Sequence, residues 1–398
     1  MRKINLDSFR VATSETAREI NRRIALNFLR THQPISRADL ARRSGLQFST
    51  VSLIVEDLIA GGWAVEGAAT SLPRGRKPKA IHLNSRKLIA ALDARPRFTT
   101  LGIANLQGEF LAVETMPTPP DARRFLREAG ARLKAMIGGA GGDFAGVGAV
   151  MPGRIDTATG RLALAPNIGW RDLEVRAPLE RATGLPVTPE SAPNACALGE
   201  IWFGRHADNV QDLVAVAVSE GCGAGIVMNG QLVLGPTGMA GEFGHVCMDE
   251  NGPPCGCGKR GCWEVFASNR AALRYHAEAL ARRPGGRRNG GELTFDGLLE
   301  LAENNDRPAR EALDRMARHL GAGIAMLTTG LAPSLIVVVG EVARAWPRVG
   351  PIVLQVVAER VQPHLATRIV PTDDLDQPRL RGGVAAVLHN HLGAPLVA

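Results

Sequence analysis

Four candidate metal ligands, one histidine and three cysteines, lie within eighteen residues past the middle of the chain in a glycine-rich segment. The four residues are His245, Cys255, Cys257 and Cys262. A structural zinc ion takes four nitrogen or sulfur ligands in a tetrahedron, and glycines let the backbone turn sharply between such ligands. The sequence therefore predicts a zinc-binding loop at residues 245–262, around which the neighbouring chain must fold.

A disulfide pair with one leftover thiol is the alternative for these cysteines. The N-terminus has no apolar segment of the kind found in a secretory signal, and the cytoplasm keeps thiols reduced. We therefore expect a cytoplasmic protein with free thiols, in which the isolated Cys247 is a small buried apolar residue. The longest apolar run, residues 335–339, is too short to cross a bilayer. It predicts a buried strand, and no membrane partner is expected.

The positive charge of the chain is concentrated at its N-terminal end. Residues 1–87 carry 16 Lys and Arg against 7 Asp and Glu, whereas the remainder carries 31 against 32. Such asymmetry indicates a polyanionic partner for this segment, and DNA is the first candidate. With 398 residues in total, the chain is long enough for two or three domains.

Apolar periodicity predicts three helices in this basic segment, at residues 15–31, 37–43 and 47–60. Ser36 is expected to cap the second helix, and Ser44-Gly45-Leu46 is a tight turn before the third. This pattern is a helix-turn-helix, whose second helix lies in the major groove with its N-terminal residues facing the bases. The candidate DNA contacts on these helices are Arg42, Arg43, Gln47, Ser49, Thr50 and Ser52.

Residues 63–83 predict two strands around a loop, which together form a wing. The loop carries Arg74, Arg76 and Lys77 between prolines, an extended basic segment that suits the minor groove of A·T-rich DNA. The alternatives are a solvated basic linker for the loop and a protein-interaction bundle for the helices. Charge, helix order and wing together favour a winged helix-turn-helix DNA-binding domain at residues 1–87.

The rest of the chain alternates strands with helices and predicts an α/β architecture. A glycine turn at residues 221–225 is expected before a short strand at 226–228. We expect two lobes, at residues 88–205 and 206–398, with a small-molecule cleft between them. The expected strands include 88–93, 99–105, 109–115, 144–150 and 213–218, and the expected helices include 121–137, 192–202, 268–281 and 306–330.

A longer motif surrounds the zinc loop and resembles the signature of the ROK family (repressors, open reading frames and kinases). It reads Gly241-Glu242-x-Gly244-His245, then Cys255-x-Cys257-Gly258-x-x-Gly261-Cys262-x-Glu264. With a DNA-binding domain in front, the chain is similar to the repressor branch, which includes N-acetylglucosamine- and xylose-type regulators. The resemblance implies two actin/hexokinase-like (ribonuclease H-like) α/β lobes and a homodimer or homotetramer.

The resemblance also implies roles for individual residues. It assigns the same four zinc ligands, and it places His245 in the sugar site too, because one imidazole nitrogen can hold a metal while the other meets a hydroxyl. For Glu242 and Glu264 the alternative is that they only orient the zinc loop. The implied sugar-contacting set is Gly153, Arg154, Asn167, Ser191, Glu242, His245 and Glu264.

The chain departs from the sugar kinases of this family at the positions that handle ATP and the proton. Where the kinases have a glycine-rich Asp-x-Gly-Gly-Thr turn, this chain has Asp93-Ala94-Arg95-Pro96-Arg97, so the backbone cradle for phosphate is lost. Ala192 stands where the kinases carry the aspartate that acts as general base, and it cannot accept a proton. Glu220 and Glu341 add carboxylates to two further turns. We therefore expect that the chain is not an enzyme.

These observations predict a sequence-specific, zinc-stabilised transcriptional regulator of carbohydrate genes, with a repressor as the first expectation. It would bind a double-stranded, palindromic, A·T-rich operator and associate with the nucleoid when bound. A sugar or sugar derivative in the cleft would control it. Two alternatives remain: an active ROK sugar kinase with a fused DNA-binding domain, and a regulator without a small ligand that a protein partner controls.

Overall fold

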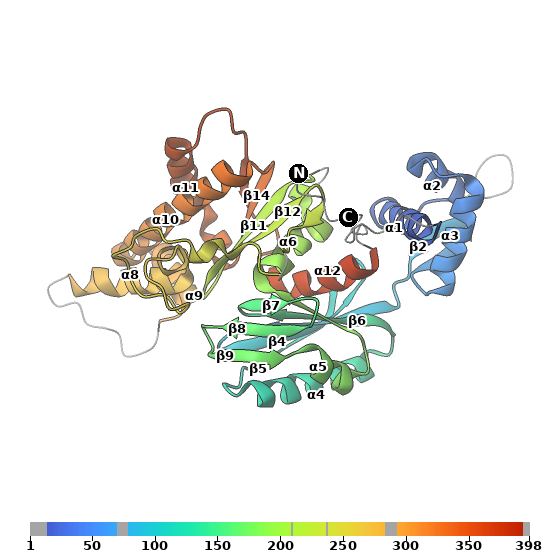
Figure 1. Ribbon diagram of the computed structural model, residues 1–398, viewed down its shortest axis with the longest axis horizontal. Helices are drawn as coiled ribbons and strands as arrows, with labels where there is room; N and C mark the ends of the chain where they lie inside the picture. Colours follow the sequence, from blue (N-terminus) through green and yellow to red (C-terminus); the bar gives the residue numbers. More distant parts are fainter. Residues whose placement is uncertain (1–13, 70–78, 208–209, 236–237, 283–292, 393–398) are drawn as a thin grey trace, which may run out of the picture.

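The structure is a computed structural model that describes residues 14–69, 79–207, 210–235, 238–282 and 293–392. Figure 1 shows three parts: a small N-terminal unit at one end and two α/β lobes that follow it. Among the described residues, no helix combines the length and the apolar character needed to cross a bilayer.

The N-terminal unit, here called the head, contains three helices and a two-stranded antiparallel sheet. Ser36 caps the second helix by accepting a hydrogen bond from the Asp39 amide, as predicted. The helices bury one apolar face each, with Leu40, Val55 and Leu58 in a common core. The elements are α1 (Ser14–His32), α2 (Arg37–Ser44), α3 (Phe48–Ala60), β1 (Ala64–Ala69) and β2 (Lys79–Leu83).

The first lobe is built on a five-stranded mixed sheet with the order β10-β6-β3-β4-β5. Strands β3, β4 and β5 form an antiparallel meander, and β6 and β10 continue the sheet in parallel. Both faces of β3 are buried, so its sequence is a continuous apolar run from Leu88 to Leu92 rather than alternating. The bounds are β3 (Lys87–Ala94), β4 (Phe98–Asn105), β5 (Phe110–Pro117), β6 (Asp143–Met151), β10 (Val187–Ser191), α4 (Ala122–Ala140) and α5 (Arg176–Thr183).

The second lobe repeats this strand order. Its sheet runs β13-β12-β11-β14-β15, again an antiparallel meander followed by two parallel strands. The strands are β11 (Leu213–Val218), β12 (Cys222–Met228), β13 (Gln231–Leu232), β14 (Leu335–Val339) and β15 (Arg368–Pro371). The helical segments are η1 (Arg205–Ala207), η2 (Glu242–His245), α7 (Glu264–Ala267), α8 (Asn269–Ala281), α9 (Phe295–Glu303), α10 (Arg307–Leu331), η3 (Glu341–Ala345) and α11 (Trp346–Arg360).

Two helices, α6 (Ala192–Phe203) and α12 (Pro378–Leu392), form a layer between the two sheets (Figure 1). Helix α12 packs on β3 and β6 of the first sheet, and α6 packs on β11 and β12 of the second. The backbone of α12 lies very close to β6: a Cβ on Gly148 of β6 would lie 2.0 Å from the carbonyl oxygen of Gly383 in α12. Only glycine allows this approach. The last helix of the expected second lobe, residues 206–398, therefore lies against the first sheet.

Several elements differ from the sequence predictions. The expected glycine turn at residues 221–225 is wrong, because β12 already begins at Cys222 and pairs with β11 along this segment. Its glycines allow close packing: a Cβ on Gly225 would lie 2.1 Å from the carbonyl oxygen of Pro193. Helix α12 was not predicted. A small sheet of β7 (Arg154–Asp156), β8 (Arg161–Ala165) and β9 (Trp170–Glu174) was not predicted either.

The head docks on the first lobe through the end of α12 and the end of α6. The Asn27 side-chain amide on α1 donates to the carbonyl oxygen of Leu392 at 3.2 Å. Arg30 donates to the carbonyl oxygen of Trp202 at 2.6 Å, and its guanidinium group lies over the indole ring of Trp202. The ring of Trp63 lies 5.0 Å from that of His391. The apolar core of the head is therefore continuous with the α6–α12 layer.

Candidate functional site

The predicted zinc ligands come together in one loop. The candidate ligand atoms of His245, Cys255, Cys257 and Cys262 all lie within 4.8 Å of one another, and among the described residues this is the one group of such side chains close enough to hold a metal ion. All six cysteines are free thiols, so the disulfide alternative does not hold in this structure. The expectation for Cys247 is wrong, because this residue is exposed.

The spacing of the four side chains fits a zinc ion. Zinc–sulfur and zinc–nitrogen bonds of about 2.3 and 2.05 Å give tetrahedral edges of about 3.8 Å between two sulfurs and about 3.6 Å between sulfur and nitrogen. In the structure Cys257 Sγ lies 3.7 Å from Cys262 Sγ, and Cys255 Sγ lies 3.6 Å from His245 Nδ1. These four residues could therefore hold zinc with little movement.

Local backbone geometry and a buried tryptophan hold the loop in place. Gly261 has a φ of +61°, and a Cβ there would lie 1.6 Å from the carbonyl oxygen of Asp249. Only glycine fits at this position. The fully buried Trp263 follows the last cysteine and donates its indole N–H to the carbonyl oxygen of His319 on α10 at 2.9 Å. The loop is thereby attached to the helical layer of the second lobe.

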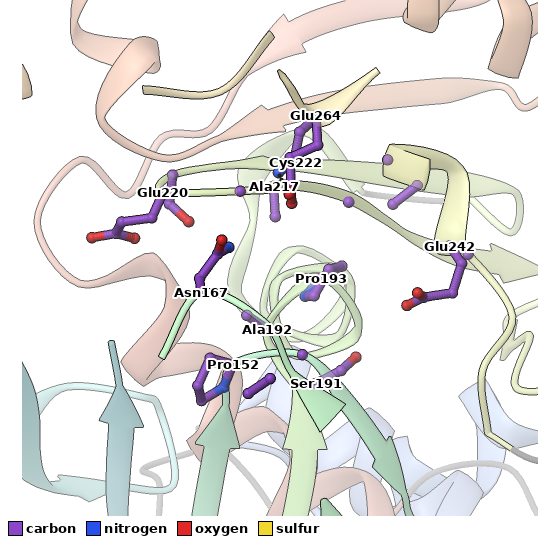
Figure 2. Close-up of a pocket in the computed structure, with 18 of the residues that line it drawn as sticks. Pro152, Asn167, Ser191, Ala192, Pro193, Ala217, Glu220, Cys222, Glu242 and Glu264 are labelled. Carbon is purple, nitrogen blue, oxygen red and sulfur yellow. Dashed lines mark hydrogen bonds between the residues drawn. The ribbon is translucent and has the colours of Figure 1, made fainter. Parts of the chain in front are cut away.

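A cleft of about 870 Å³, counted with its open mouth, lies beside this loop between the two lobes. Figure 2 shows Asn167 and Ser191 on one side of it and Glu242 and Glu264 on the other. Six of the seven predicted sugar contacts line it, which are Gly153, Asn167, Ser191, Glu242, His245 and Glu264. The seventh, Arg154, is not among the lining residues, but its guanidinium donates to Glu242 at 2.7 Å.

His245 joins the metal cluster to the cleft. Its Nδ1 atom faces Cys255 Sγ, whereas its Nε2 atom lies 3.7 Å from Glu242. Burial raises the pKa of the Glu264 carboxyl, although nearby His245 opposes that shift. Glu264 also accepts a hydrogen bond from the Cys222 amide at 3.2 Å. Both carboxylates thus face the cleft and also contact residues around the cluster.

The segment at the start of α6 carries a second buried carboxyl. Burial raises the pKa of Glu190 to about 7, although its hydrogen bonds from the Ser191 amide and the Asn194 side chain act in the opposite direction. Ala192, the first residue of α6, lines the cleft and presents only a methyl group. No proton acceptor is therefore supplied at this position.

Sequence reasoning did not identify several charged residues that complete this region. Arg379 at the start of α12 lines the cleft, pairs with Asp93 at 2.7 Å and donates to the Ser219 hydroxyl at 3.3 Å. Arg270 on α8 donates to Asn167 Oδ1 at 2.6 Å. No sequence signal marks these residues, because their partners are more than one hundred positions away along the chain.

The predicted DNA contacts on the helices lie at the outer side of the head. Arg42, Arg43, Gln47 and Ser49 are exposed, and Thr50 and Ser52 are partly exposed. Arg42 also forms an ion pair with Asp39 of its own helix. The remaining predicted contacts, Arg74, Arg76 and Lys77, lie outside the described residues.

Two α/β lobes with the same strand order, joined around a polar cleft, define an actin/hexokinase-like protein. The model described as "ROK family" matches residues 90–389. The chain belongs to the ROK family. The xylose repressor of Bacillus subtilis (strain 168) is 26% identical over 388 residues, which cover 96% of this chain and 98% of that protein.

Two solved structures show how far the similarity extends. A ROK family transcriptional regulator, described as a homologue of the E. coli MLC protein, matches with a TM-score of 0.81 at 24% identity, covering 95% of this chain and 98% of that one. A ROK family glucokinase from Streptomyces griseus, in complex with glucose and AMPPNP, matches with a TM-score of 0.68 at 28% identity. That second match covers 75% of this chain and 98% of the glucokinase chain.

Proposed function

We propose that this protein is a sugar-responsive transcriptional repressor of carbohydrate genes that binds operator DNA through its head. The observation that carries the proposal is the path of α12. At its first turn Arg379 lines the cleft, and at its last residue Leu392 accepts a hydrogen bond from α1 of the head. A helix of fifteen residues is about 22 Å long, so one rigid element contacts both the cleft and the head.

We propose that residues 1–87 form a winged helix-turn-helix. Helix α3 follows α2 across a turn at Gly45, whose φ of +72° suits the end of a helix. Strands β1 and β2 pair behind it as the two strands of a wing. The surplus of basic residues in this segment favours DNA as the partner. A symmetric operator needs two heads, so we propose a homodimer or homotetramer.

The proposed effector is a sugar or sugar derivative. Glu242, Glu264, His245 and Asn167 supply acceptors and donors at the cleft, and polyols are bound by such side chains. The B. subtilis relative is named for xylose, which makes D-xylose the first candidate. Zinc, held by His245 and the three cysteines, would fix the orientation of the imidazole whose Nε2 faces the cleft.

Control of DNA binding requires that the sugar bind two lobe arrangements with different affinity. A change in the angle between the lobes would move the α6–α12 layer, because α6 packs on the second sheet and α12 on the first. The head contacts the ends of both helices. Its orientation, and with it the spacing of two heads in an oligomer, would change accordingly.

We also propose that this protein does not catalyse phosphoryl transfer to a sugar. Ala192 provides no general base, a change that typically costs a factor on the order of 10²–10⁴ in rate. Arg95 forms ion pairs with Glu220 and Glu341 from the other lobe, at turns that in ROK kinases approach ATP. The competing function is a sugar kinase with a DNA-binding head, and the glucokinase relative is its main support.

Selection of random DNA duplexes by the purified full-length protein, followed by an assay for ADP formation, separates the two functions. We expect enrichment of a palindromic sequence, affinity that falls steeply with salt, and no ADP formation above the protein-free rate with D-xylose, D-glucose or N-acetylglucosamine. Hexose-dependent ADP formation would support the kinase. Absence of any enriched duplex would reject the repressor.

A further inference from the structure

Helix α3 presents large apolar side chains to solvent at the place where a base-reading surface is expected. Phe48 and Leu53 are 57% and 63% exposed, and they are two of the three large apolar side chains above 55% exposure among the described residues. Neither belongs to the core of the head, which α3 reaches through Val51, Ile54, Val55 and Leu58. More than half of each side chain is therefore exposed to solvent and available for contact with a partner.

These two residues share one face of the helix with hydroxyl groups. Ser52 follows Phe48 by four positions and Leu53 follows Ser49 by four, so each pair is stacked one turn apart. We call Phe48, Ser49, Ser52 and Leu53 the α3 patch. Figure 1 shows α3 on the outer side of the head, with α1 between it and the lobes.

The electrostatic setting of the α3 patch favours a polyanion over an apolar protein groove. From Phe48 to Val55 the helix carries no charged residue, and its positive dipole end lies at Phe48. Arg42 and Arg43 are exposed at the end of the preceding helix. Gln47, at the N-cap, makes no capping hydrogen bond with its side chain, so its amide can contact another group.

In the major groove of DNA, one base carries an apolar group that a side chain can contact, the C5 methyl of thymine. We propose that Phe48 and Leu53 contact thymine methyl groups and make this protein select T·A pairs at those operator positions. The inference rests on the proposed function and adds a specificity determinant to it. Ser49 and Ser52, between the two apolar side chains, would hydrogen-bond to neighbouring base edges or phosphates.

Replacement of thymine by deoxyuridine tests the contact, because it deletes the methyl group and leaves base pairing intact. Each thymine of the selected operator is replaced in turn, and the dissociation constant is measured by fluorescence anisotropy for wild type, F48A and L53A. We expect deoxyuridine at the contacted position to weaken wild-type binding about fourfold, the equivalent of exposing one methyl group. The same replacement should change binding by F48A or L53A much less.

Two controls make the result specific. L375A removes another half-exposed leucine, in the segment between β15 and α12 and outside the head, and should keep the full deoxyuridine penalty. Urea unfolding of F48A and L53A should match wild type, because both side chains are exposed.

Equal deoxyuridine penalties in wild type and both variants at every thymine would overturn the inference while the repressor function stands. Unchanged operator affinity in both variants would overturn it too and assign the α3 patch to a protein partner. A protein that selects no duplex would remove the proposed function itself and the inference with it.

Discussion

Arg95 of the first lobe forms an ion pair with Glu341 of the second, with its guanidinium nitrogen 2.6 Å from the carboxylate. The same guanidinium lies 3.3 Å from Glu220. Burial by itself would raise the pKa of Glu341, but the positive charge of Arg95 and the hydrogen bonds to this carboxylate together lower that pKa. One side chain, at a turn where ROK kinases carry glycine, thus links the two lobes.

Replacement of Arg95 by methionine should destabilise the protein by about 2–4 kcal/mol, because two largely buried carboxylates lose their partner. The double variant R95M/E341Q should recover part of this loss. Urea unfolding at pH 7.5 measures both. The control R123M removes an exposed arginine on α4 and should change stability by less than about 0.5 kcal/mol. Equal stability of R95M and R123M would show that the ion pairs do not hold the lobes together.

Metal content tests the loop. We expect one zinc ion per chain by elemental analysis of the purified protein, and its loss in C257S, which removes one of the four clustered ligands. The variant should be less stable by on the order of 2–5 kcal/mol, because the remaining thiols and the imidazole lose their common partner.

C247S is the matched control for the zinc prediction. Cys247 lies in the same segment but outside the four-residue cluster, so this variant should keep its metal and its stability. Retention of a full zinc ion by C257S would contradict the assigned ligand set.

Glu200 on α6 should make stability depend on pH. Burial raises its pKa from 4.5 to about 7, although a hydrogen bond from Thr372 acts in the opposite direction. The folded protein therefore binds an extra proton between these values, and stability falls as the pH rises from about 4.5 to 7. E200Q removes this penalty and should be more stable than wild type at pH 8 by up to about 3 kcal/mol, with little difference at pH 4.5.

Thermal or urea unfolding at pH 4.5, 6 and 8 measures the effect of E200Q. E303Q changes an exposed glutamate at the end of α9 and should follow the wild-type pH profile. A constant difference between E200Q and wild type at all three values would show that Glu200 does not titrate in this range.

The contact between α1 and α12 should carry the response to sugar. N27A removes the hydrogen bond to the carbonyl oxygen of Leu392, at a cost in stability of about 1 kcal/mol. Operator affinity without sugar should change little, whereas the ratio of affinities with and without sugar should move toward one. T31A is the control, since the Thr31 hydroxyl bonds to partners within α1: the carbonyl oxygens of Asn27 and Phe28 and the ring nitrogen of His32. An unchanged ratio in N27A would exclude this contact from the coupling.

Sequence patterns sufficed for elements with a strong apolar signal, such as an uninterrupted apolar run. Residues 213–218 and 335–339 match β11 and β14 to the residue, because both strands are buried on each face and contain only apolar residues. The cluster of four candidate ligands was also predictable, since these residues lie within one short loop. Helix α12 was missed because Gly382 and Gly383 interrupt its helical pattern, whereas the structure needs small residues there for close packing.

Contacts between distant segments were beyond prediction from the sequence. Arg379 reaches Asp93 and Ser219 only after α12 has returned to the first sheet. The role of Arg95 depends on Glu341, which lies 246 positions further along the chain. The glycines of β12 look like a turn in sequence, and the neighbouring Pro193 explains them: its ring lies against Gly223 and its carbonyl oxygen against Gly225.

A sugar bound in the cleft should change the affinity of the head for its operator. Fluorescence anisotropy of the selected duplex, titrated with the full-length protein in the presence and absence of D-xylose, D-glucose or N-acetylglucosamine, measures this directly. We expect at least one sugar to shift the dissociation constant about fivefold or more, and E264Q to lose this shift while keeping the sugar-free affinity. A sugar that binds the protein by calorimetry but leaves operator affinity unchanged would contradict it.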